Sequence, residues 1–267
     1  MRRRLCTLLL ILSRPLAAQL PFYTDDPAVT DRGGVHFEFF DEYDFLQREQ
    51  FPNLRQNTAN YKINYGLPHN LELDLDAPYL AIYRTLSIAP GTSAGVGDTN
   101  LGVKWNFHIE AAGSPLPALS ASLYVEFPTG DKTQQLGSGL TDYALNFIGQ
   151  HHFTEKTRVT GNLGILFAGN TSTGVVGIET TRGRVYTGGF SLIRDFSPKW
   201  TLGAEVYGGL TSNLNLARSQ VQVLAGGNYN VREGFALAFG LLGGKYIASP
   251  RIGLQIGFAV DFPQVLH

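Results

Sequence analysis

Acidic side chains recur at even spacings in two short stretches near the start of the chain. They are Glu38, Glu42, Asp44, Glu72, Asp74 and Asp76. Even spacing along an extended strand places side chains on one face. Rings of charge select ions in channels, so one interpretation is a lining that favours cations or polar solutes. The alternative is pairing with Lys62, Lys104 or Arg158, which would fill and stiffen an interior.

Other residues that could do chemistry lack the required spacing. The histidines are His36, His69, His108, His151, His152 and His267, and no two of them have the four-residue spacing of a zinc-binding helix. The glycines between 91 and 102 do not match a nucleotide-binding spacing, and the Gly-x-Ser-x-Gly motif of many hydrolases does not occur. The sequence therefore predicts no metal, no cofactor, no catalytic residues and no enzyme activity.

The first 18 residues have the pattern of an export signal. Arg2, Arg3 and Arg4 precede a short apolar run over 5–12, and small residues follow at 17 and 18. The run is too short to span a bilayer as a helix, which takes about 20 residues. We therefore expect a cleaved signal peptide over 1–18. Its removal takes away Cys6 and four arginines, which leaves a mildly acidic mature chain without cysteine.

The mature chain, 19–267, alternates apolar and polar residues along most of its length. Alternation of this kind is typical of strands with one apolar face. Twelve stretches of about nine to twelve residues are predicted as strands, and this length lets a tilted strand cross a bilayer. They are 35–45, 58–66, 71–81, 98–108, 119–127, 140–150, 157–167, 184–194, 200–210, 220–230, 235–243 and 251–262.

The connections between these strands are alternately short and long, with some exceptions. Short connections such as 67–70 and 195–199 alternate with longer ones such as 82–97 and 168–183. Bacterial outer-membrane barrels have short periplasmic turns and longer outer loops. The predicted fold is therefore an all-β, antiparallel, up-and-down transmembrane barrel of about 12 strands. Residues 19–34 would form a periplasmic N-terminal segment of this barrel domain.

A barrel in lipid presents its apolar face outward and its polar face to the lumen. A sheet in hydrocarbon must close, because every backbone N–H and C=O has to be paired. A water-soluble barrel gives the same alternation inside out, but the export signal and the 16% of charged residues favour the membrane. The predicted lumen-lining residues are Glu38, Glu42, Lys62, Glu72, Asp74, Lys104, Glu126, Arg158 and Glu205.

Several short motifs, taken in order, resemble one known family. They are TDDP at 24–27, GDTNLGVK at 97–104, FPTGD at 127–131, LGSG at 136–139 and TD at 141–142. Together they resemble the MetA-pathway of phenol degradation family of outer-membrane transporters. The motif residues are Gly97, Asp98, Pro128, Gly130, Asp131, Gly139 and Asp142, and we expect them at strand–loop junctions on the outer side. The resemblance implies uptake, sometimes of aromatic compounds, and brings no catalytic residue set.

The leading hypothesis is an outer-membrane channel or transporter-like barrel that takes up small solutes, aromatic ones among them. Its expected partners are outer-membrane lipid and those solutes; nucleic acid is not expected, because the chain has no basic tract. One alternative is an outer-membrane lipid hydrolase or deacylase, whose Ser and His would be brought together by the fold. Another is a structural barrel with a blocked lumen. The sequence predicts no particular oligomeric state.

Overall fold

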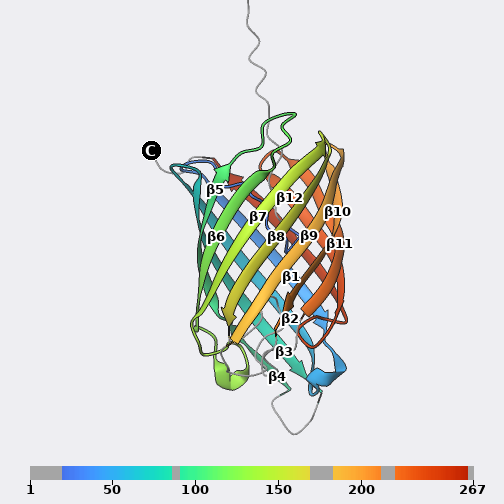
Figure 1. The fold of residues 1–267 in the computed structure, drawn as a ribbon. Coiled ribbons are helices and arrows are strands. Elements are labelled where there is room, and N and C mark those ends of the chain that lie inside the picture. The colour runs from blue at the N-terminus through green and yellow to red at the C-terminus, as the bar shows by residue number, and fades with distance from the viewer. Residues whose placement is uncertain (1–19, 86–90, 169–182, 212–219, 264–267) are drawn as a thin grey trace, which may run out of the picture.

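The protein is a single closed β-barrel (Figure 1). A computed structural model describes residues 20–85, 91–168, 183–211 and 220–263. The strands are β1 (Val35–Phe45), β2 (Asn53–Leu67), β3 (Leu71–Arg84), β4 (Thr92–Val96), β5 (Thr99–His108), β6 (Ala118–Phe127), β7 (Asp142–Thr154), β8 (Thr157–Ala168), β9 (Gly183–Ser197), β10 (Trp200–Leu210), β11 (Gln220–Arg232), β12 (Phe235–Lys245) and β13 (Ile252–Phe262).

All neighbouring strands are antiparallel, and the first pairs with the last. β1 pairs with β13 along its whole length, with Val35 opposite Phe262 and Phe45 opposite Ile252. β4 and β5 both pair with β3 and form one wall strand that is interrupted at Gly97 and Asp98. The wall therefore has twelve strands, as predicted, and its sheet closes on itself.

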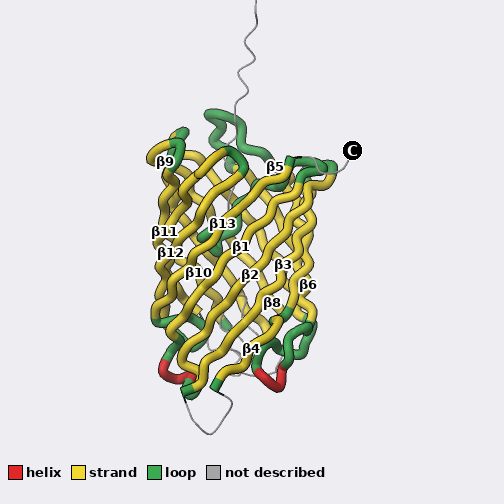
Figure 2. The backbone as a smooth tube through the Cα atoms, turned by 180° about the vertical axis from the view of Figure 1, so that it is seen from behind, coloured by secondary structure: helices red, strands yellow, loops and turns green. Residues whose placement is uncertain are grey.

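The two ends of the barrel differ in the length of their connections. At one end, here called the turn end, β7 joins β8 through residues 155–156 and β9 joins β10 through 198–199. The other end, the loop end, carries the long connection over 128–141 and two short 3-10 helices, η1 (Arg48–Gln50) and η2 (Lys132–Gln134), drawn red in Figure 2. The predicted alternation of short and long connections holds only in part, because the connection over 109–117 at the turn end is longer than the one over 246–251 at the loop end. The side of the membrane that each end faces stays a prediction.

The outer surface of the wall is apolar. Leu241, Leu254 and Ile256 are each more than half exposed, although they are large aliphatic side chains. Such exposure is unfavourable in water and is expected for a surface that faces hydrocarbon. Aromatic side chains lie near both ends of the strands: Trp200 packs on Tyr229 with ring centroids 4.8 Å apart, and Tyr43 lies near Tyr83 at 6.2 Å. The described residues contain no helix able to cross a membrane.

Each predicted strand overlaps an observed one, but several bounds are wrong: β2 already begins at Asn53, and β7 continues to Thr154. Two strands, β1 and β10, have the bounds that alternation predicted. The predicted connection over 82–97 is wrong in part, because β3 continues to Arg84 and β4 occupies Thr92–Val96. These two strands pair with each other at the loop end, so the wall extends further in that direction than the predicted strands do. The predicted long connection over 168–183 lies almost wholly outside the described residues.

Candidate functional site

Residues 20–34, here called the N-terminal segment, run inside the barrel. Glu205 on β10 accepts hydrogen bonds from the backbone N–H groups of Tyr23 and Thr24, each 2.8 Å long. The Pro27 carbonyl accepts a hydrogen bond of 2.6 Å from the Asn106 side chain. We expected this stretch to lie on the periplasmic side of the barrel, whereas its described part contacts the lumen wall.

Charged groups fix the segment to the opposite wall. Lys104 on β5 is 3% exposed, and its Nζ lies 3.3 Å from Asp25 Oδ1 and 3.1 Å from Glu72 Oε1. Glu72 in turn accepts two hydrogen bonds from Thr30. A buried charge is tolerated only when it is paired and hydrogen-bonded, and here the pairing joins the segment to β3 and β5.

An apolar contact anchors the first residues of the segment. Phe22 packs in a buried cluster with Ile193, Leu224 and Leu242, which come from β9, β11 and β12. Gly203 on β10 makes room for this ring, because a Cβ there would lie 2.9 Å from the Phe22 ring. The segment is therefore held by an aromatic side chain on one side of the lumen and by ion pairs on the other.

The segment divides the space inside the barrel. On the loop side lies a cavity of about 300 Å³, here called the inner cavity, which Leu20, Tyr23 and Asp25 line from the segment. On the turn side lies a wider space of about 1290 Å³, lined by residues 27–32 of the segment and by the turn-end connections. The segment thus forms the partition between the two openings.

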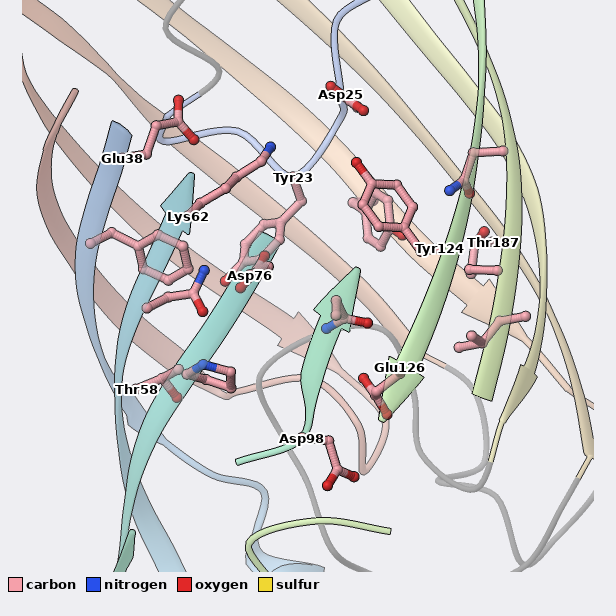
Figure 3. Close-up of a pocket in the computed structure, with 18 of the residues that line it drawn as sticks. Tyr23, Asp25, Glu38, Thr58, Lys62, Asp76, Asp98, Tyr124, Glu126 and Thr187 are labelled. Carbon is pink, nitrogen blue, oxygen red and sulfur yellow. The ribbon is translucent and has the colours of Figure 1, made fainter. Parts of the chain in front are cut away.

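The inner cavity combines carboxylates with aromatic rings. Figure 3 shows Glu38, Lys62, Asp76 and Glu126 on strands of the wall, with Tyr23 and Asp25 of the segment between them. The acidic lining residues are Asp25, Glu38, Glu42, Asp76, Asp98, Glu126 and Asp142, and the one basic lining residue among the described ones is Lys62. The aromatic lining residues are Phe22, Tyr23, Phe40, Tyr124 and Tyr207.

The structure places the nine predicted lumen residues on the inner side of the wall. Six of them are almost completely buried: Glu38, Glu42, Glu72, Asp74, Lys104 and Glu205. Lys62 and Glu126 are partly exposed and line the inner cavity. Arg158 lies apart from the others near the turn end, where its guanidinium is 3.3 Å from Asp195. Of the three basic residues considered as partners of the acidic cluster, Lys104 pairs with Glu72, whereas Arg158 pairs with Asp195.

The family-motif residues connect the wall to the loop between β6 and β7. The Asp98 carboxylate accepts hydrogen bonds from the N–H groups of Gly130, at 3.0 Å, and Ser138, at 2.7 Å. Asp131 begins η2 and accepts a hydrogen bond from the Thr133 N–H. Gly97 lies with Asp98 between β4 and β5, and Pro128 directly follows β6. Gly139 has a positive φ of 71°. Asp142 is the first residue of β7 and lines the inner cavity.

The histidines contact carboxylates and a carbonyl. His36 lies between Glu38 and Asp261, and His108 faces the Pro117 carbonyl. His151 and His152 each lie 2.7 Å from one oxygen of Glu110. In the described part of the chain no histidine hydrogen bond reaches a serine, and no group of His, Cys, Asp and Glu is arranged to hold a metal ion.

Sequence reasoning missed the residues of the N-terminal segment that line the inner cavity. Phe22, Tyr23 and Asp25 belong to no alternating stretch, so nothing assigned them to the lumen. The one available signal was the motif at 24–27, which was noted for its resemblance and not for a position inside the barrel. Tyr124 was also missed, although it lies on β6 and donates to Asp74 at 2.7 Å.

Comparisons with known proteins agree on the fold. A family model described as "Putative MetA-pathway of phenol degradation" matches residues 24–262. The chain is similar to the crystal structure of the COG4313 outer membrane channel from Pseudomonas putida F1, with a TM-score of 0.71, 15% identity, and coverage of 89% of this chain and 98% of the other. No curated protein matches the sequence.

Two porin structures are similar at greater distance. The NanC porin gives a TM-score of 0.57 at 8% identity, covering 84% of this chain and 98% of the porin. The KdgM porin gives 0.54 at 8% identity, covering 85% of this chain and 99% of the porin. At such low identity these likenesses concern the fold, which is that of outer-membrane barrels.

Proposed function

Because the chain belongs to the family described as MetA-pathway of phenol degradation, we propose that it is a channel through which small aromatic solutes cross the bacterial outer membrane. The observation that carries the proposal is the inner cavity. It lies inside a closed wall whose outer face is apolar, and aromatic and polar side chains line it together. This combination suits a solute with an aromatic ring and a polar group.

The number of strands supports a narrow path. Barrels of about eight strands are filled by side chains, whereas those of sixteen or more leave a water channel. A twelve-stranded wall lies between these cases, so the N-terminal segment decides how wide the path is. The proposed path runs from the inner cavity past Tyr23 and Asp25 to the turn-end space. Of the predicted lumen residues, Glu38, Glu42, Lys62 and Glu126 line the inner cavity.

The location and processing of the chain follow from the same proposal. The apolar outer face would contact outer-membrane lipid, and residues 1–18 would be removed on export. We favour a channel over an enzyme. The contacts of the described histidines support this choice, because they go to Glu38, Asp261, Glu110 and a carbonyl instead of to a serine.

Planar-bilayer recording on the purified, folded chain tests the proposal. We expect discrete single-channel steps in salt solution, together with release of benzyl alcohol from liposomes that contain the protein. The variant Glu205→Ala removes the acceptor of the Tyr23 and Thr24 N–H groups, and we expect it to conduct more than the wild type. A folded protein that gives neither conductance nor solute release would contradict a channel and favour a structural barrel.

A further inference from the structure

The outer face of β1 and β2 carries polar side chains in its half nearer the loop end. Asp41 on β1, and Arg55 and Asn57 on β2, point away from the lumen, because the residues that alternate with them, such as Glu42 and Thr58, line the inner cavity. The neighbouring strand β13 is apolar on this surface. Its outward residues are Ile252, Leu254, Ile256, Phe258, Val260 and Phe262. The three polar side chains therefore interrupt an apolar surface.

Hydrocarbon alone is a poor environment for these side chains. Asp41 and Asn57 are partly exposed, and the Asn57 amide donates a hydrogen bond of 2.8 Å to the Asp41 carboxylate. Within the described structure neither Asp41 nor Arg55 forms an ion pair. A charged side chain on the lipid side of a barrel is unfavourable unless it lies close to the headgroups. These residues therefore indicate contact with polar headgroups.

Arginine side chains gather at the loop end of the same strands. Arg55 is exposed and is the third residue of β2, which begins at this end. Arg48 in η1 is exposed, and Arg84 is the last residue of β3. The three arginines outnumber Glu49, which is exposed in η1, and Asp41. This rim therefore attracts phosphate groups, which a guanidinium binds through two parallel hydrogen bonds.

Tyrosine rings surround the polar side chains. The Arg55 guanidinium lies 5.7 Å from the centre of the Tyr83 ring, and this ring lies 6.2 Å from that of Tyr43. Tyr61 and Tyr79, on the same faces of β2 and β3, are 46% and 48% exposed. At a membrane boundary tyrosine keeps its ring among acyl chains and its hydroxyl among headgroups. Its ring face can also pack on the C–H groups of a sugar.

We propose that this outer surface of β1–β3, here called the polar face, binds the headgroup of a phosphorylated glycolipid in the leaflet around the loop end. Arg55 binds a phosphate group, and Asp41 and Asn57 bind hydroxyl or amide groups of the sugar. Phosphorylated glycolipids form the outer leaflet of bacterial outer membranes, so the proposal places the loop end on the outer side. It does not depend on an open lumen.

Three lipids test which part of the headgroup is recognised. Lipid A carries sugar and phosphate, phosphatidylglycerol carries phosphate without sugar, and digalactosyl diacylglycerol carries sugar without phosphate. Native mass spectrometry on the folded full chain in detergent measures their binding. We expect lipid A to bind at least about tenfold more tightly than either of the others, as for one additional charge-assisted hydrogen bond. Equal binding of lipid A and phosphatidylglycerol would overturn the proposal.

Substitutions at the two ends of the barrel locate the site. Arg55→Gln removes the charge, and we expect it to bind lipid A at least about tenfold more weakly. Arg194→Gln is the matched control, because Arg194 is also exposed and lies 5.6 Å from the centre of the Phe196 ring, but at the turn end of β9. It should bind as the wild type does. Asn57→Leu should weaken lipid A binding and leave phosphatidylglycerol binding unchanged. Circular dichroism checks that each variant is folded.

The outcomes separate the lipid site from other uses of the polar face. Equal losses in Arg55→Gln and Arg194→Gln would show unspecific attraction of anions and overturn the proposal. A dimer that becomes monomeric in Arg55→Gln or Asn57→Leu would assign the polar face to contact between two copies and would also overturn it. A protein that prefers lipid A but does not conduct would support the lipid site and contradict the channel.

Discussion

Thr30 donates two hydrogen bonds to a single carboxylate oxygen of Glu72, one from its backbone N–H and one from its hydroxyl, each 2.6 Å long. The second oxygen of Glu72 lies 3.1 Å from Lys104 Nζ. One wall residue therefore holds both the backbone of the N-terminal segment and the lysine that binds Asp25. The contacts of Glu72 therefore fix the position of the segment along the barrel axis.

Replacing Thr30 should loosen the segment. Thr30→Val removes the hydroxyl donor and keeps the side-chain shape, so we expect a loss of about 1.5–3 kcal/mol in segment docking, as for a hydrogen bond to a charged group. Hydrogen exchange over 20–34 should become faster and the single-channel conductance larger. Thr30→Ser keeps both donors and serves as the control. Equal exchange in Thr30→Val and the wild type would show that this contact does not hold the segment.

Truncating Phe22 should also loosen the N-terminal segment, because it removes the apolar contact that anchors it. Phe22→Ala leaves a void among Ile193, Leu224 and Leu242, and such a truncation costs about 3–5 kcal/mol in a well-packed core. We expect the segment to become accessible to added protease while the wall strands stay protected. Phe22→Leu, which fills more of the site, should be milder. If both variants resist protease as the wild type does, the aromatic anchor is dispensable.

Asp98 should control the order of the loop between β6 and β7. In Asp98→Asn the side-chain amide meets one of the two N–H groups of Gly130 and Ser138, so at least one hydrogen bond is lost, at a cost of about 1–3 kcal/mol. Hydrogen exchange across residues 128–141 should rise. Asp131→Asn, in the same loop, should affect only the start of η2. A larger effect of Asp131→Asn would contradict this assignment.

The turn end should respond to acid through Glu110. Its side chain is held by His152 and His151, and although burial acts to raise its pKa, hydrogen bonds from His152 lower the pKa below the ordinary value for Glu. A lowered carboxyl pKa in the folded state gives stability that is complete above the unfolded pKa, about 4.3, and is lost as the pH falls through the folded pKa.

We therefore expect the connection over 109–117 to loosen only when the pH falls below about 4.3. Hydrogen exchange of this connection, measured at several pH values, shows the change. In Glu110→Gln the acid dependence should disappear, because the titrating carboxyl is gone. Glu155→Gln, an exposed residue in the neighbouring turn, should keep it. Loosening that begins above pH 5 in the wild type would assign the effect to another group.

The wall was predictable because its pattern is local. In β10, from Trp200 to Leu210, the side chains alternate between the two faces, and this alternation is visible in the sequence itself. The inward position of Glu205 follows from the same parity. The exact extent of β3 and β4 was not predictable, because Gly97 and Asp98 have the composition of a turn although they lie within the wall.

The N-terminal segment was not predictable because its partners are distant in sequence. Asp25 binds Lys104, 79 residues away, and Tyr23 binds Glu205, 182 residues away. No spacing rule connects such residues, and the segment has no regular alternation of apolar and polar residues. The acidic pattern indicated carboxylates on the inward face, but the group that each one contacts depends on the segment, as for Glu72, which binds Thr30 and Lys104.

The pairing of β1 with β13 has a consequence for assembly. These two strands lie at opposite ends of the barrel domain, so their contact closes the longest loop that the chain can make. Until β13 arrives, β1 is an edge with unpaired amides, open to pairing with another chain. A substitution at this junction, such as Gly257→Val, where a Cβ would lie 2.3 Å from the Phe39 carbonyl oxygen, should therefore slow maturation and favour aggregates.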